Sequence, residues 1–493
     1  NKGGGFKKWY GNNDYVVAFD KNSYLVLATM GNNLPSKKLY FNYSLTWSSL
    51  SSSSFGARHN GYGFTFSAKG ACAFPIDKES GNFILGMLNS KISSEILSFF
   101  SPTLDFNVGD IRQIPIPDIS QLNLNKSFSL IESSIEVSKE EWNSKEMSWD
   151  FNQNELVRIK GQDFEESYDL FQQYWKNKFF QLHKNEEELN KQFIDIYGLQ
   201  EELTPEVPLE DITILKEETK IVNNQLVFQE KEIFKQFLSY AVGCMFGRYS
   251  LDKEGLILAN QGETLEDYLN VIASETKQSP SFLPDDDNII PILDDEWFED
   301  DIVNRFYEFL KVTFGKPNFE KNLAFVEECL GKDVRKFFVK DFYTDHIKRY
   351  KKRPIYWMFS SQKGAFNVLI YMHRYNQDTL SQILNGYLKE YREKLNTHIE
   401  QLDHLIVSGS SSEQTKASKE KDKLKNVLLE LQEYEREVLY PLATERIPID
   451  LDDGVLVNYN KFGTAIKKVT GLNDAKAKEK VKKFDWIDTS EIR

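Results

Sequence analysis

The stretch NFILGMLNSKISSEILSFFSPTLDFNVGDIRQIPIP, residues 82–117, decides the fold that we expect for the first part of this chain. Its first half places apolar side chains at steps of three and four residues, which predicts a helix over 82–100 with one apolar face. Pro102 is expected to end this helix, because proline cannot continue one. A loop over 104–110 follows, and the two prolines near the end favour an extended edge strand over 111–116.

Residues upstream of this stretch predict a small mixed lobe. Its β-prone runs cover 15–19, 24–28, 39–47, 62–67 and 71–76, with Ser- and Gly-rich connections between them. The longest connection, 48–63, is expected to be a polar loop that presents Arg58 and His59. We interpret residues 1–118 as one lobe of this kind.

The remainder of the chain is expected to be mainly helical. Helical spacing begins near Ser127 and continues over 165–197, and a further tightly packed helix with small residues begins at Phe234. Apolar residues from Leu380 to Val438 follow the three–four alternation of a coiled coil, interrupted at 408–412, which predicts an antiparallel helical hairpin. The fold class is therefore α+β. The expected divisions are 1–118, 119–250 (helical spacer), 251–375 (mixed, with a basic aromatic segment), 376–442 (hairpin) and 443–493 (a β-hairpin at Asp453-Gly454 and a basic tail).

Charge is unevenly distributed along the 493 residues, whose formal net charge is −14. Residues 1–118 carry a local balance of +3, residues 332–363 carry +7, and residues 461–483 carry +6. Basic patches on an acidic body suit a protein that contacts DNA at limited places, although ordinary surface variation also produces them. The sequence contains no run of 18 apolar residues, so it predicts no membrane span. Three widely spaced cysteines indicate a reduced, cytoplasmic protein.

Candidate DNA contacts follow from these basic segments and from polar loops. Arginine in a polar loop can enter a groove and read guanine, and lysine neutralises phosphates, so each candidate has an alternative as an ordinary solvent-facing residue. The candidates are Lys7, Lys8, Arg58, His59, Asn60, Asn89, Lys91, Lys348, Arg349, Lys351, Lys352 and Arg353.

Catalytic and metal-binding patterns are not found in the sequence. The acidic run over 285–301 has no nearby histidine, and helix capping explains it better than a cation does. An adenine methyltransferase needs a polar-Pro-Pro-aromatic tetrapeptide for the flipped base, and no Pro-Pro pair occurs. We therefore expect this chain by itself to hold no cofactor and to be catalytically inert.

Several long motifs resemble the C-terminal half of the PglX family, the adenine-specific DNA methyltransferases of BREX phage-defence systems. They are FKKWYGNNDYVV, LNSKISSEILSFFSPTLDFNVGDIRQIPIP, FIDIYGLQEELTPEV, SYAVGCMFGRYSLDKEGL, DNIIPILDDEWFEDDI, HIKRYKKRPIYWMFSS, LIYMHRY and RIPIDLDDGVLVNYNKFG. The resemblance extends nearly end to end. It does not include the family's catalytic tetrapeptide, so no catalytic residue is carried over.

The resemblance implies a target-recognition region followed by a helical spacer. It also implies a missing N-terminal methyltransferase domain that binds S-adenosylmethionine, double-stranded DNA as partner, and other BREX proteins. Two alternatives remain open: a non-catalytic scaffold that docks defence proteins, and a type I restriction specificity subunit. The sequence does not predict the DNA target.

Overall fold

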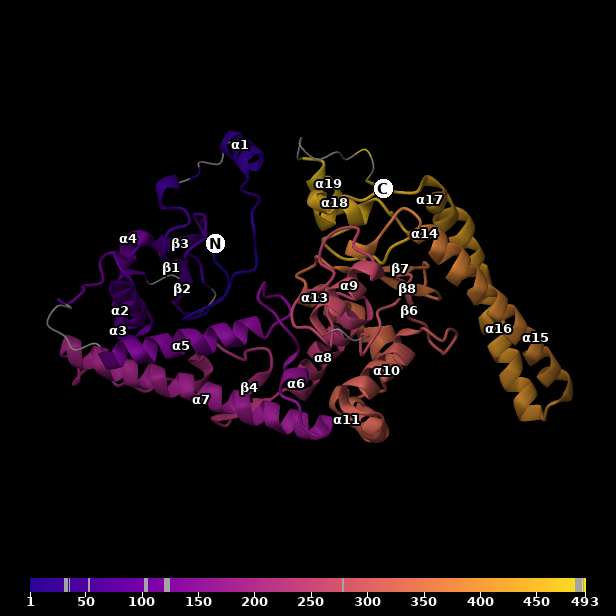
Figure 1. Cartoon of the computed structure of the whole chain (residues 1–493), viewed down its shortest axis with the longest axis horizontal. Helices are drawn as coiled ribbons and strands as arrows, with labels where there is room; N and C mark the ends of the chain where they lie inside the picture. Colours follow the sequence, from indigo (N-terminus) through magenta and orange to yellow (C-terminus); the bar gives the residue numbers. More distant parts are fainter. Residues whose placement is uncertain are drawn as a thin grey trace. The chain divides into compact units, whose positions relative to one another are not determined.

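The computed structural model describes residues 1–30, 34, 36–51, 54–101, 105–118, 125–276, 279–483, 490 and 492–493. They form two compact units: unit 1 is Asn1–Phe151 with Tyr168–Gln229, and unit 2 is Asn152–Ser167 with Glu230–Arg493. Both combine helices with small antiparallel sheets, so the expected α+β class is confirmed (Figure 1). The finer five-part division remains a prediction.

Unit 1 contains two small sheets and several helices. Its elements are α1 (Lys21–Thr29), η1 (Lys37–Leu39), β1 (Ser44–Ser48), β2 (Ala57–Gly61), β3 (Gly70–Ala73), α2 (Lys78–Asn89), α3 (Lys91–Phe100), α4 (Val108–Ile111), α5 (Asn125–Asn143), most of α7 (Phe164–Tyr197), η3 (Leu209–Asp211), β4 (Thr219–Val222) and β5 (Gln225–Phe228). Strand β1 lies between β2 and β3, antiparallel to both. The helices expected from Ser127 and over 165–197 are confirmed as α5 and α7.

The short strands of unit 1 were the least accurate predictions. Residues 24–28 lie in α1 rather than in a strand, because the Asp20 side chain caps this helix by accepting from the amides of Asn22 and Ser23. None of the α1 residues is buried, so packing does not impose a strand on its β-prone side chains. The runs at 15–19 and 62–67 form no strand, and those at 39–47 and 71–76 shrink to β1 and β3.

Residues 82–117 also differ from the prediction. The single expected helix is two helices, α2 and α3, because the backbone of Ser90 is extended between them. Pro102 and Leu104 lie outside the described residues. The expected edge strand over 111–116 is absent from the described chain. Successive backbone hydrogen bonds that start at the Asn107 carbonyl instead form the helical turn α4.

Unit 2 is built around a three-stranded sheet. Its elements are α6 (Glu155–Arg158), the first four residues of α7, α8 (Glu230–Met245), α9 (Leu265–Thr276), β6 (Ile290–Pro291), α10 (Ile302–Phe314), η4 (Lys316–Asn318), α11 (Phe319–Leu330), α12 (Val334–Phe337), η5 (Phe338–Phe342), α13 (Tyr343–Arg349), β7 (Tyr356–Ser360), β8 (Asn367–Tyr371), η6 (Met372–Arg374), α14 (Thr379–Gln382), η7 (Ile383–Leu388), α15 (Lys389–Ser408), α16 (Ser411–Glu433), η8 (Tyr434–Leu439), α17 (Tyr440–Glu445), η9 (Leu451–Asp453), α18 (Gly454–Asn460) and α19 (Ala475–Val481).

The core of unit 2 lies on this sheet, whose strand order is β6-β8-β7. Every residue of β7 and β8 is buried, so Tyr356, Trp357 and Phe359 are core residues. Helix α8 packs closely at Gly243, where an added Cβ would overlap the Tyr249 ring, so the expected role of its small residues is confirmed there.

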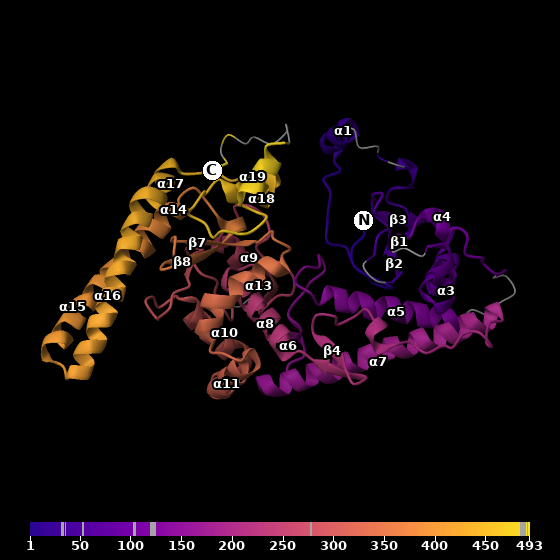
Figure 2. The same ribbon diagram turned by 180° about the vertical axis from the view of Figure 1, so that it is seen from behind.

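The expected antiparallel hairpin is α15 and α16, which lie side by side in both views (Figure 1, Figure 2). Ion pairs such as Arg392–Glu435 and Asp403–Lys421 join residues at mirrored positions, as antiparallel helices require. The predicted interruption becomes a tight turn, because Ser410 and Glu413 form a capping box that starts α16.

Two further expectations concern capping and the C-terminal segment. Asp301 accepts from the amides of Val303 and Asn304 at the start of α10, which confirms capping within the acidic run. The β-hairpin predicted at Asp453-Gly454 is wrong, because Gly454 begins the helix α18. The Asp450 side chain accepts from the Asp452 amide in the turn before it, and the Asn458 side chain donates to the Gly454 carbonyl at 3.1 Å. No helix in the described part of the chain is long and apolar enough to cross a bilayer.

Candidate nucleic-acid interface

The turn after α13 displays the densest basic cluster that the sequence predicted. Lys348, Lys351, Lys352 and Arg353 are exposed. The Lys352 amide donates to the Ile347 carbonyl at 2.8 Å, which ends the helix. Lys351 and Lys352 take positive φ values of 50° and 64° in this turn. Left-handed backbone at two successive non-glycine residues costs energy, and such strain is often found at functional sites.

Arg349, at the end of the same helix, has a different environment. It is partly buried and forms an ion pair with Asp345 at 2.7 Å, one helical turn earlier. Its charge is therefore partly balanced within unit 2.

The second basic segment, 461–483, lies beside this turn. Ile466 forms an antiparallel bridge with Phe359, and the Lys467 amide donates to the Met358 carbonyl at 2.8 Å. The chain after α18 therefore runs along β7. Lys352 reaches the same segment, because a Cβ added at Gly471 would lie 3.3 Å from its Nζ. Two stretches more than a hundred residues apart thus place their lysines in one region of unit 2.

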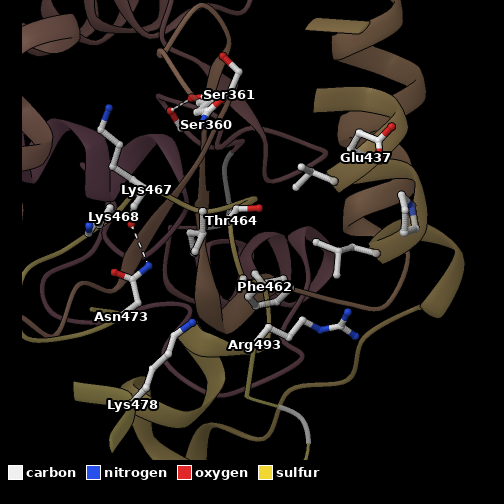
Figure 3. Close-up of a pocket in the computed structure, with 16 residues that line it drawn as sticks. Ser360, Ser361, Glu437, Phe462, Thr464, Lys467, Lys468, Asn473, Lys478 and Arg493 are labelled. Carbon is white, nitrogen blue, oxygen red and sulfur yellow. Dashed lines mark hydrogen bonds between the residues drawn. The ribbon is translucent and has the colours of Figure 1, made fainter. Parts of the chain in front are cut away.

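A cavity of about 760 Å³ opens within this region (Figure 3). Lys467, Lys468 and Lys478 lie on one side of it, and Glu437 from the base of the hairpin lies on the other. Arg493 also lines it and pairs with Glu445. Cationic residues outnumber acidic ones in this lining, which favours an anionic ligand.

Lys7 and Lys8 are engaged inside unit 1. Lys7 pairs with Glu141 at 2.8 Å and Lys8 pairs with Glu186 at 2.7 Å, and both carboxylates are buried. Burial alone would raise the pKa of Glu141, but Lys7 and Lys145 hold it below its ordinary value. These lysines therefore compensate buried charge where the structure places them, rather than lying open to phosphates.

Arg58 does not lie in a loop. Residues 57–61 form β2 against β1, and Arg58 is 1% exposed. Its Nε and Nη2 atoms meet no acceptor among the described residues, and burial lowers its pKa to about 10. The expectation of a long loop over 48–63 is therefore wrong for residues 57–61, because they form a strand that pairs with Ser44–Trp47. Ser52 and Ser53 lie outside the described residues. A DNA contact by Arg58 stays a prediction, and it requires the side chain to leave this position.

The neighbours of Arg58 in β2 are also held by unit 1. His59 is partly buried beside the Tyr43 ring, and burial lowers its pKa. Asn60 is buried and donates to the Ser44 hydroxyl at 3.1 Å. A role in reading bases therefore remains a prediction for both.

Asn89 fastens α2 to β2. Its Oδ1 accepts from the Ala57 amide at 2.8 Å, and its Nδ2 donates to the Ala57 carbonyl at 3.0 Å. The interpretation of Asn89 as a solvent-facing residue is wrong, because both amide groups are used in the interior. Lys91 is partly buried, with its backbone amide donating to Asn190 at 2.9 Å.

The residues around the cavity were not selected individually from the sequence. The signal for them was the charge of +6 over 461–483, but only the pairing with β7 shows which lysines meet. Within the described ranges, no group of three or more His, Cys, Asp or Glu side chains could hold a metal ion.

Comparison with known proteins gives clear relatives. No family model matches the chain. It is 34% identical over 493 residues to the adenine-specific methyltransferase BrxX of Escherichia coli O9:H4 (strain HS), covering 95% of this chain and 40% of the relative. It is 36% identical over 496 residues to the adenine-specific methyltransferase PglX of Lacticaseibacillus casei (strain Zhang), covering 96% and 39%. The chain therefore spans about two-fifths of the length of these relatives.

Proposed function

Because the chain is homologous to the PglX and BrxX adenine-specific methyltransferases, we propose that it is the DNA-recognition part of such an enzyme. In this proposal the chain binds double-stranded DNA, and methyl transfer from S-adenosylmethionine to adenine takes place on another part of a longer polypeptide. The whole enzyme then marks host DNA as self in a BREX phage-defence system, together with other BREX proteins.

The observation that carries the proposal is the meeting of two basic segments in unit 2. The exposed turn at 348–353 and the lysines of 461–483 adjoin through β7, on a chain whose net charge is −14. Lysines gathered in one region repel one another, and a bound anion relieves that repulsion. Phosphates of a duplex supply such anions, and the counterions that they release drive binding.

Sequence reading belongs, in this proposal, to residues 1–118. The resemblance of this lobe to target-recognition regions supports it, as does its local charge of +3. Arg58, His59 and Asn60 remain the proposed base contacts. Because Arg58 and Asn60 are buried, their side chains must move outward from β2 to reach a base.

The test is a titration of fluorescent duplex DNA with the wild-type chain and with Lys351→Gln/Lys352→Gln/Arg353→Gln, at several salt concentrations. We expect the triple variant to bind every sequence more weakly and its salt slope to flatten by about 0.9 for each phosphate that the variant no longer neutralises.

The matched control is Lys416→Gln/Lys419→Gln/Lys425→Gln, which removes the same charge from exposed positions of α16. It should leave the slope unchanged. If both variants weaken binding equally, the effect is one of net charge, and the basic turn is not the phosphate-binding surface.

A second candidate function is a protein-docking scaffold. The observation in its favour is the end of the hairpin, where Leu405 and Val407 are 45% and 84% exposed. The same titration separates the two functions, because a scaffold without a DNA role shows no salt-dependent binding of duplex.

A further inference from the structure

Arg248, which follows α8, is held between two tyrosines of unit 2. Its Nε donates to the Tyr249 hydroxyl at 2.9 Å, and its Nη1 donates to the Tyr371 hydroxyl at 3.1 Å. The guanidinium carbon lies 5.3 Å from the Tyr249 ring centre and 6.0 Å from that of Tyr371. Tyr371 is itself fixed, because its hydroxyl donates to the Leu258 carbonyl at 2.8 Å. The guanidinium plane is therefore held in one orientation.

The charge of Arg248 has no acidic partner in the described part of the chain. Arg335 and Arg349 pair with Asp301 and Asp345, whereas no carboxylate lies within ion-pair distance of Arg248. Burial would lower the pKa of Arg248, but the oxygens of the surrounding tyrosines hold it well above its ordinary value, so the group stays charged. A bound anion can stabilise a largely enclosed cation of this kind.

The groups that surround Arg248 are neutral near pH 7. Burial, with the charges of Arg349 and Arg248, lowers the pKa of His346 well below its ordinary value. Burial and the charge of Arg248 lower the pKa of His373 to about 4. The Glu263 carboxylate opposes this lowering of the His373 pKa. One Glu263 oxygen accepts from the amides of Ala259 and Asn260 at 2.6 and 2.8 Å. His346 and His373 are therefore neutral and do not balance the charge of Arg248.

The remaining donors of Arg248 are open to a ligand. Arg248 is only partly buried, and its Nη2 donates to no described residue yet is not sealed from solvent. Arg374 differs, because its guanidinium donates to the carbonyls of Phe246, Asp285 and Asp286. A purely structural arginine is saturated in that way, whereas Arg248 keeps part of its planar fork free. Such a fork matches the oxygens of a phosphate.

The basic turn lies near this group. The ring of Tyr350, the residue before Lys351, lies 4.7 Å from the ring of His346, which lies 4.9 Å from that of Tyr356. The Tyr356 ring lies 5.6 Å from that of Tyr371, whose hydroxyl accepts from Arg248. We propose that Arg248 binds one phosphodiester of duplex DNA and that the exposed turn at 348–353 contacts the flanking phosphates. This inference rests on the proposed function and adds a specific anchoring residue to it.

Footprinting of the wild-type chain tests the inference without any change to its fold. The chain is treated with phenylglyoxal, which modifies accessible arginines, with and without duplex DNA, and the modified peptides are quantified by mass spectrometry. Bound duplex should protect Arg248 and should leave Arg436 in η8, 78% exposed in its side chain, as reactive as before. Equal modification of Arg248 with and without bound duplex overturns the inference.

Two variants add a quantitative readout. Arg248→Gln should weaken duplex binding roughly tenfold on every sequence and flatten the salt slope by about 0.9, as expected when one cation no longer neutralises a phosphate. Arg248→Lys keeps the charge but loses the fork, so it should keep the slope and recover part of the affinity. An Arg248→Gln chain that is folded and binds as wild type overturns the inference.

Failure of the inference is distinguishable from failure of the proposed function. If the wild-type chain binds no duplex, both fall. If it binds duplex and the Lys351–Arg353 triple variant flattens the slope, while Arg248 is neither protected nor sensitive to substitution, only the assignment of Arg248 falls.

Discussion

Asp285 carries a carboxyl group into the interior of unit 2, where its Oδ1 accepts from the Ile289 amide at 2.8 Å. Burial raises its pKa to about 6, and Arg305 and Arg374 offset that burial only in part. In the unfolded chain this carboxyl has its ordinary pKa of 3.8. Between these values the native state binds more protons than the unfolded state, so stability falls as pH rises from about 4 to about 6 and is constant above that window.

We expect Asp285→Asn to remove this pH dependence. The substitution keeps an oxygen that can accept from Ile289 and removes the buried charge, so the free energy of unfolding at pH 7 should rise by at most about 3 kcal/mol. At pH 4 the variant and the wild type should be equally stable. Urea unfolding at both pH values measures this, with Asp422→Asn on the exposed side of α16 as control. A variant less stable than wild type at pH 7 would contradict the assignment.

At the scale of elements, close packing in α8 contrasts with open space in η7. Gly243 faces the Tyr249 ring so closely that no Cβ fits without movement, and the Tyr356 hydroxyl lies 3.1 Å from the same Cβ position. Gly386, in η7 of the same unit, has nothing within 4 Å of its Cβ position. Both glycines lie in helical segments, so their alanine variants differ mainly in packing.

Gly243→Ala should destabilise unit 2 by about 1–3 kcal/mol, because Tyr249 must move to admit the methyl group. Gly386→Ala should be neutral or stabilising by up to about 1 kcal/mol, because alanine forms helix more readily than glycine. Thermal unfolding compares the two variants directly. Equal effects would show that the space around Gly243 adapts without strain. Because Tyr249 also holds Arg248, Gly243→Ala should weaken duplex binding as well.

Local signals were sufficient for the long helices and insufficient for the short elements. Helices α5, α7, α15 and α16 contain enough turns for their apolar spacing to be unambiguous, and the Ser410 capping box marks the start of α16. The sequence predicts a loop at β2 because Arg58 and Asn60 are polar, although both are buried in the structure. Only the neighbouring strand and Asn89 explain why such residues lie inside.

At the scale of the whole molecule, an acidic chain concentrates positive charge in two segments of unit 2. Residues 332–363 carry +7 and residues 461–483 carry +6, against a total of −14. Short-range screening lets such a region attract a polyanion even when the net charge repels it. Steering to this region therefore depends on the arrangement of charges rather than on their sum.

We expect the two segments to contribute independently to the salt dependence. Lys467→Gln/Lys468→Gln/Lys476→Gln removes three exposed lysines of the second segment. It should flatten the salt slope by about 0.9 for each phosphate left without its lysine, and the combined variant should have a flatter slope than either triple variant. Titrations of both triple variants and of their combination measure this. A second triple variant with the wild-type slope would confine the phosphate contacts to the first segment.

The sequence by itself determined the α+β class, the long helices, the helical hairpin, the two basic segments and the resemblance to PglX, since each depends on spacing, caps or charge within one segment. Tertiary structure alone decided the fate of individual charged residues. Arg58 is buried, Lys7 and Lys8 face buried carboxylates, and the two basic segments meet along β7. The physical reason is that burial and charge pairing depend on partners more than a hundred residues away, or on a neighbouring strand, and no local pattern encodes which partners those are.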